Sequence, residues 1–285
     1  MKTVLQTIQS GTPYLEKAGV DSPRLNMEHL LAHVMGCKRM DLYLRFNEPL
    51  EEKTLEPLRD LTRRRAKREP LQHLLGSIEF MGREFKCDTR ALIPRPETEE
   101  LVEKILSHYK KHSLPAPDKI LDMGTGSGVI GLSLAHAFPE AHATLADISP
   151  DALALARENA EKTALPEERT TFILTDLFQN LSGGPFDLIV ANLPYIAADE
   201  VPTLSAEVQK DPVLALDGGP AGTEIIATFL EALAPHAAPG ALIALEIGAG
   251  QSPGLLPVME HSGLREARSV PDYSGRDRFL FSNAP

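Results

Sequence analysis

The hydrophobic residues of the first 70 positions recur at helical intervals. The clearest series is Met27, Leu30, Leu31, Val34 and Met35. These positions fall on one face of an α-helix. Ser22 and Pro23 predict its N-cap and first residue, and Gly36 predicts its end. A second helix is predicted from about residue 54 to 67, with Pro57 in its first turn. Residues 1–70 are therefore expected to form a small helical domain.

Residues 71–93 show a different period. Ile78 and Phe80 alternate with polar neighbours, and so do Phe85 and Cys87, with Met81-Gly82-Arg83 between the two runs. Alternation on both sides of a turn is typical of a β-hairpin. We expect this segment to link the helical domain to a third part, residues 94–285.

From residue 119 onward, short apolar runs alternate with helical patterns. Strands are predicted near residues 119–122, 142–147, 170–174, 186–191, 240–246, 265–270 and 277–282. Helices are predicted near residues 128–138, 150–162, 222–235 and 250–261. Strands separated by helices form βαβ units, so we expect an α/β domain with a mostly parallel sheet.

A glycine-rich turn follows the first of these strands. After Ile120-Leu121-Asp122-Met123 come Gly124, Thr125, Gly126, Ser127 and Gly128. Glycines let a backbone turn tightly and approach a ligand, and the N-terminus of the next helix offers N–H groups. Asp147 ends the following strand, where a carboxylate suits the ribose hydroxyls of an adenosine. Because Gly126, Gly128 and Gly131 also fit the dinucleotide fingerprint, the glycines alone leave NAD open.

Two carboxylates favour S-adenosylmethionine over NAD. Asp122 precedes the first glycine, where we expect it to face a cationic ligand and not a pyrophosphate. Asp176 follows the next strand and adds a polar group near the adenine. The sequence therefore predicts an S-adenosylmethionine site. No metal is expected, because no third ligand with suitable spacing follows the histidine pairs His29/His33 and His108/His112.

The strand over residues 186–191 ends in Asn192, Leu193, Pro194 and Tyr195. Methyl transfer to an amide or aromatic amino nitrogen is difficult because the lone pair is delocalised. The Asn192 side-chain oxygen and the Leu193 carbonyl can grip the two N–H protons and orient the nitrogen, while Tyr195 packs on the planar group. Such catalysis depends on positioning and electrostatics.

The overall composition is that of a globular protein with a net charge of −11. That charge disfavours a broad nucleic-acid-binding surface. With two cysteines, no signal segment and no apolar stretch long enough to span a membrane, a cytoplasmic protein is expected. The basic run at residues 63–68 is interpreted as a solvated helix end, with a docking patch for an acidic partner or RNA as the alternative.

The sequence resembles the release-factor glutamine methyltransferase family over nearly its whole length. The resemblance rests on the glycine turn, Asp147, the Asn192-Leu193-Pro194-Tyr195 motif and, most specifically, Ile93-Pro94-Arg95-Pro96-Glu97-Thr98-Glu99. It is strengthened by Leu216-Asp217-Gly218-Gly219, Leu245-Glu246-Ile247-Gly248 and Asp277-Arg278-Phe279.

The resemblance implies a helical domain that docks a peptide chain release factor and a Rossmann-like, seven-stranded class I methyltransferase domain. It implies methylation of the glutamine side-chain amide in a Gly-Gly-Gln loop. Residues 124–128, Asp147 and Asn192 would contact the cofactor, as would Leu177 beside Asp176.

One departure from the family pattern keeps other readings open. Leu193 stands where the family usually has proline, and Asn-Leu-Pro-Tyr also occurs in ribosomal-RNA adenine dimethyltransferases. The alternatives are therefore an adenine-amino methyltransferase acting on RNA or DNA, and a non-catalytic module that binds a release factor or the ribosome.

Overall fold

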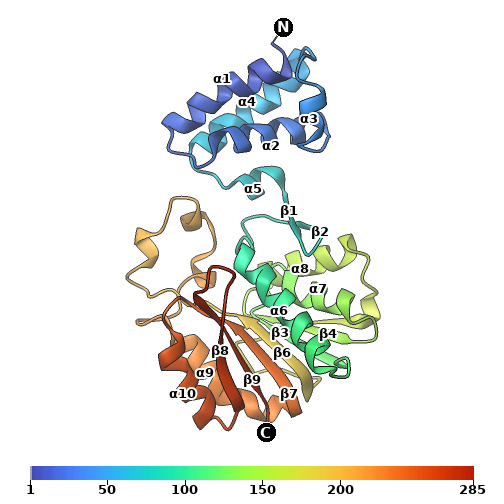
Figure 1. Cartoon of the computed structure of the whole chain (residues 1–285), viewed down its shortest axis with the longest axis vertical. Helices are drawn as coiled ribbons and strands as arrows, with labels where there is room; N and C mark the ends of the chain where they lie inside the picture. Colours follow the sequence, from blue (N-terminus) through green and yellow to red (C-terminus); the bar gives the residue numbers. More distant parts are fainter. Residues whose placement is uncertain (1) are drawn as a thin grey trace. The chain divides into compact units, whose positions relative to one another are not determined.

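The computed structural model describes residues 2–285, which divide into two compact units (Figure 1). Unit 1 comprises the residues up to Ser77 together with Ser205–Lys210. Unit 2 comprises Ile78–Leu204 and Asp211–Pro285. Within the described residues, no helix is both long enough and apolar enough to cross a bilayer.

Unit 1 is helical, as predicted. Its helices are α1 (Val4–Lys17), α2 (Pro23–Met35), α3 (Asp41–Leu44), α4 (Glu52–Ala66) and α5 (Leu71–Leu75). Leu15 of α1, Leu30 and Leu31 of α2, and Leu58 of α4 belong to one buried apolar cluster. The apolar face that the sequence predicts on α2 thus packs inward, which is the main source of stability for short helices.

One prediction for these helices is confirmed in position but not in its contact, and one is wrong. Ser22 is the N-cap residue of α2 and Pro23 its first residue, as predicted, but Ser22 is left-handed (φ 48°) and its side chain makes no capping hydrogen bond. Helix α4 begins at Glu52, so Pro57 lies inside the helix and not in its first turn. Tertiary packing of the apolar face of α4 outweighs the one backbone hydrogen bond that proline removes.

The basic run at the end of α4 is largely paired inside unit 1. Arg65 is buried, and its guanidinium lies 2.9 Å from the Glu207 carboxylate. Arg68 reaches the same carboxylate at 2.6 Å, and Arg64 pairs with Glu69 at 2.5 Å. The interpretation as a solvated helix end is therefore wrong for Arg65, because this charge is buried against the segment Ser205–Lys210.

Unit 2 is built on a seven-stranded sheet with the strand order β5-β4-β3-β6-β7-β9-β8 (Figure 1). The strands are β3 (Lys119–Met123), β4 (His142–Asp147), β5 (Thr170–Leu174), β6 (Phe186–Asn192), β7 (Ala237–Glu246), β8 (Arg265–Pro271) and β9 (Asp277–Asn283). The strands from β5 to β7 are parallel, whereas β9 is antiparallel to both β7 and β8. The predicted strands and the mostly parallel sheet are confirmed.

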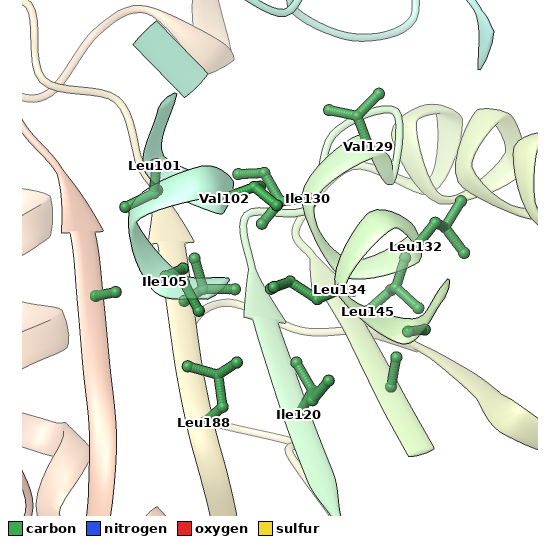
Figure 2. Close-up of a cluster of buried hydrophobic side chains, with 14 of the residues drawn as sticks. Leu101, Val102, Ile105, Ile120, Val129, Ile130, Leu132, Leu134, Leu145 and Leu188 are labelled. Atoms are coloured by element: carbon green, nitrogen blue, oxygen red, sulfur yellow. The ribbon is translucent and has the colours of Figure 1, made fainter. Parts of the chain in front are cut away.

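Helices cover both faces of this sheet. They are α6 (Pro96–His112), α7 (Val129–Ala137), α8 (Pro150–Lys162), α9 (Glu224–Leu233) and α10 (Ser252–His261). Successive strand residues enter different clusters: Ile120 and Leu188 contact α6 and α7, whereas Leu121 and Ile189 belong to the cluster of α9 and α10. Figure 2 shows Leu101 and Ile105 of α6 above the strand residues of the first cluster. Because both faces of the sheet are covered by helices, the sequences of its strands are continuous apolar runs.

A two-stranded sheet of β1 (Ser77–Phe80) and β2 (Arg83–Lys86) precedes α6. The predicted turn is present, with Met81 and Gly82 both at positive φ. Phe80 and Phe85 are buried in the first cluster and pack edge to face. The hairpin is thereby part of the hydrophobic core of unit 2.

Candidate active site

Unit 2 contains a cavity of about 400 Å³ at the carboxyl edge of its sheet, a volume usual for small-molecule sites. The segments that line it follow four successive parallel strands: residues 124–127 after β3, 147–149 after β4, 175–177 after β5 and 192–194 after β6. The structure thus brings together the glycine turn, Asp147, Asp176, Leu177 and the start of the Asn192 motif. Gly128 and Tyr195 do not line this cavity.

The glycine turn is held against the end of β4 by backbone hydrogen bonds. The N–H groups of Gly124 and Thr125 both donate to the Ala146 carbonyl, at 2.8 and 3.0 Å. Gly124 and Gly126 have φ values of 69° and 55°, which other residues rarely adopt. A Cβ at Gly124 would lie 2.8 Å from the Leu193 side chain, so the turn and the transfer motif are in direct contact.

Gly128 contributes packing at the start of α7. Its φ is 85°, and a Cβ there would lie 3.3 Å from the Ala156 Cα on α8. The fully buried Asn159 of α8 donates to the Ser127 carbonyl at 2.9 Å. Together these contacts fix the point at which the turn becomes a helix.

Asp122 supports the glycine turn from the protein interior. It is fully buried, and its Oδ2 accepts hydrogen bonds from the Thr125 hydroxyl at 2.6 Å and the Gly131 N–H at 2.8 Å. Burial raises the pKa of Asp122 to about 6 despite these two donors. The prediction that Asp122 faces a cationic ligand is wrong, because the carboxylate is used to hold the turn to α7.

Asp147 lies in the cavity wall at the end of β4. Its Oδ2 accepts from the Gly126 N–H at 2.8 Å and its Oδ1 accepts from the Ser149 N–H at 2.9 Å. Burial raises the pKa of Asp147, and these backbone donors oppose the rise. Each oxygen keeps a further lone pair for a ligand hydroxyl.

Asp176 and Leu177 lie beyond the end of β5. Asp176 is exposed and accepts from the Gln179 side chain at 3.0 Å. Leu177 adopts a left-handed conformation (φ 48°), which is uncommon for leucine. Both residues line the cavity, so the wall there combines a polar and an apolar group.

The transfer motif continues β6 at the cavity. Asn192 and Pro194 line the cavity, and the Leu193 side chain is buried beside Gly124. Tyr195 is not among the lining residues, and its hydroxyl lies 3.2 Å from Glu246 Oε1. This contact raises the pKa of Tyr195, together with the larger effect of burial.

Thr98 and Glu246 belong to the site, although no role was predicted for them from the sequence. The Asn192 Nδ2 lies 3.2 Å from the Thr98 hydroxyl, which donates to Glu246 Oε2 at 2.8 Å. Asn192 and Glu246 are register partners at the ends of the neighbouring strands β6 and β7. The polar residue at the end of β7 could have indicated that Glu246 lies near Asn192, since adjacent parallel strands end at the same edge of a sheet.

Two glycines press against the backbone of the motif. A Cβ at Gly218 would lie 2.7 Å from the Pro194 carbonyl oxygen, and one at Gly222 would lie 2.6 Å from the Tyr195 carbonyl oxygen. The Gly218 N–H donates to the Ile196 carbonyl at 2.8 Å. Close backbone approach therefore explains the Gly218-Gly219 turn that the sequence left without a role.

An ion pair joins two further segments that line the cavity, residues 91–94 and 212–215. The buried Asp211 carboxylate lies 2.8 Å from the Arg95 guanidinium and 3.4 Å from the Ile93 N–H. Burial raises the pKa of Asp211 to about 6, and Arg95 opposes the rise.

Family models match both parts of the chain. One described as the PrmC N-terminal domain matches residues 6–76, and one described as the methyltransferase small domain matches residues 101–211. These matches cover the helices of unit 1 and most of the cavity-lining segments of unit 2.

Similar proteins extend over almost the full length. The release factor glutamine methyltransferase of Moorella thermoacetica is 40% identical over 278 residues, which cover 97% of this chain and 96% of that protein. The one of Deinococcus radiodurans is 38% identical over 273 residues, which cover 96% and 95%. A T. thermophilus 16S rRNA methyltransferase, solved with AdoMet and guanosine, superposes with a TM-score of 0.53 at 18% identity, over 73% of this chain and 50% of that chain. The last likeness concerns the fold alone.

Proposed function

The chain belongs to the release factor glutamine methyltransferase family, and from this premise we propose that it methylates the side-chain amide nitrogen of the glutamine in the Gly-Gly-Gln loop of peptide chain release factors. The predicted family, fold class and cofactor are confirmed. The observation that carries the proposal is the meeting of the glycine turn with Asn192 and Leu193 in one cavity.

The cavity fits S-adenosylmethionine in size and chemistry. The backbone of residues 124–127 would hold the amino-acid tail, and Asp147 would accept hydrogen bonds from the ribose hydroxyls. Asp176 and Leu177 would flank the adenine. When bound, the cofactor supplies an electrophilic methyl group on a sulfonium.

Within this site, the motif at the end of β6 would orient the acceptor nitrogen. The Asn192 Oδ1 and the Leu193 carbonyl are the two acceptors for the amide protons of the glutamine. Holding both protons fixes the nitrogen relative to the methyl group, so that catalysis comes from orientation and preorganised dipoles. Tyr195, with its hydroxyl on Glu246, would close the motif on the side away from the cavity.

Residues 1–70 would form the docking domain for the release factor, joined through the segment 71–93 to the catalytic part, residues 94–285. The net charge of −11 disfavours direct nucleic-acid binding. We place the reaction in the cytoplasm, where peptide chain release factors meet the ribosome.

The test is methyl transfer from labelled S-adenosylmethionine to a purified release factor, with ribosomal RNA offered in parallel. A factor whose Gly-Gly-Gln glutamine is replaced by alanine is the control. Label on the intact factor that disappears with the replaced one is the expected result. Label on the RNA alone would support an adenine-amino methyltransferase, and cofactor binding without any label would support a non-catalytic binding module.

A further inference from the structure

Glu246 is a carboxyl group that the transfer chemistry described above does not use. It is 1% exposed, and burying a charge is costly unless donors surround it. The donors here are specific: the Thr98 hydroxyl at 2.8 Å on one oxygen and the Tyr195 hydroxyl at 3.2 Å on the other. Both donors connect Glu246 to the motif that grips the substrate.

Glu246 is linked to Asn192 through the hydroxyl group of Thr98. The Thr98 hydroxyl has one hydrogen, and it is donated to Glu246. The Thr98 oxygen can then only accept, and the atom of Asn192 that lies 3.2 Å away must be the donor nitrogen, Nδ2. With Nδ2 directed at Thr98, the side-chain oxygen Oδ1 is directed away from it.

We infer that Thr98 and Glu246 are positioning residues for methyl transfer, which set the amide orientation of Asn192 so that its oxygen is the atom offered to the substrate nitrogen. This inference rests on the proposed function. It adds two residues from other elements to the site: Thr98 in the first turn of α6 and Glu246 at the end of β7. In the reversed orientation, Asn192 would present a donor to an amide that itself offers two protons.

The device depends on the ionised form of Glu246. The ionised carboxylate has free acceptor sites on both oxygens, whereas a protonated carboxyl carries a hydrogen on one of them and becomes a weaker acceptor there. Burial raises the pKa of Glu246 to about 7, and Glu97 acts in the same direction. The hydroxyls of Thr98 and Tyr195 and the positive charge of Arg278 oppose the rise. Turnover should therefore fall as the pH drops below about 7.

The experiment compares Thr98→Val, Thr98→Ser and Glu246→Gln with the unmodified enzyme. Each is assayed for kcat and KM with a release factor, for the Kd of S-adenosylmethionine and for thermal unfolding. Valine keeps the shape of threonine without its hydroxyl, and serine keeps the hydroxyl. A glutamine side chain at position 246 accepts from one hydroxyl but presents a donor to the other.

We expect Thr98→Val and Glu246→Gln to lower kcat roughly 10- to 100-fold, the usual effect of losing a hydrogen bond to a charged group. The Kd of the cofactor should change little, and Thr98→Ser should recover most of the activity. In the unmodified enzyme kcat should rise with pH around 7, and Glu246→Gln should lose this rise.

Three results would overturn the inference: an unchanged kcat in Thr98→Val and Glu246→Gln, a Thr98→Ser enzyme as impaired as Thr98→Val, or losses that match the fraction of unfolded protein. Failure of the proposed function itself would give a different result. If the unmodified enzyme binds cofactor but labels no release factor, the proposed function fails, and the inference fails with it.

Discussion

Leu193 is the residue at which this chain departs from the usual family motif, and its surroundings explain how leucine is accommodated. Its side chain is 5% exposed and packs beside Gly124 in the apolar cluster that includes Ile226 and Phe229. The group proposed to accept a substrate proton is the main-chain carbonyl, which leucine and proline share. Pro194 still restricts residue 193 to extended conformations.

Asn192 gives the sharpest prediction at the scale of single residues. Replacing Asn192 with alanine removes an acceptor that is proposed to act on the reacting nitrogen, so kcat should fall about 100- to 1,000-fold. Binding of the release factor should persist, because one buried contact is lost from a large surface.

Transfer of label and a pull-down with the factor would measure the two effects separately. Asn283→Ala, on β9 and away from the cavity, is the matched control. Full activity of Asn192→Ala would remove this residue from the proposed mechanism.

At the scale of elements, the cavity wall depends on segments that lie far apart in sequence. The Arg95–Asp211 ion pair holds the stretch before α6 to the stretch that carries Pro212, Leu214 and Ala215. Arg95 is about one-third exposed, whereas the Asp211 side chain is fully buried.

We predict that Arg95→Ala lowers the free energy of unfolding by about 1–3 kcal/mol, below the usual value for a fully buried pair because Arg95 is partly solvated. The KM for S-adenosylmethionine should rise because both wall segments loosen.

The loss of stability from combining Arg95→Ala with Asp211→Asn should be smaller than the sum of the two single losses, since each substitution removes the same contact. Urea unfolding of the single and double variants measures this coupling. Equal and additive losses would show that the two side chains act independently.

At the scale of the whole molecule, several buried carboxyl groups surround the cavity with raised pKa values. Burial raises the pKa of Asp122 and of Asp211 to about 6 and the pKa of Glu246 to about 7. Such a group binds more protons in the folded than in the unfolded state, so its contribution to stability is lost as the pH rises through the folded pKa. Ionisation of these carboxyl groups thus lowers the free energy of unfolding in the same pH range in which ionisation of Glu246 favours turnover.

We predict that the free energy of unfolding decreases by about 1 kcal/mol from pH 6 to pH 8 because of Glu246, one pKa unit being worth 1.36 kcal/mol. Burial lowers the pKa of His29, His108, His136 and His236, and these groups act in the opposite direction below about pH 6.5. Thermal unfolding across this range, with Glu246→Gln as the comparison, measures the effect. The same slope in both proteins would contradict the assignment to Glu246.

Features that depend on neighbouring residues could be predicted from the sequence. Short apolar runs separated by helical patterns predicted every strand of the large sheet, and the polar residues at the strand ends predicted that Asp147, Asp176 and Asn192 lie at one edge, where the cavity is. These predictions hold because each buried strand must be apolar on both faces, and because parallel strands end at one edge.

Contacts between residues that are distant in sequence became visible only in the folded chain. Thr98 and Glu246 are 148 positions apart, and Arg65 and Glu207 are 142 apart. No local spacing records such pairs, because they follow from strand register and from the path of the chain between elements. The same reason explains why Asp122 was expected at the ligand and lies beneath the turn. Its place in the sequence is next to the glycines, but the direction of its side chain is fixed by α7.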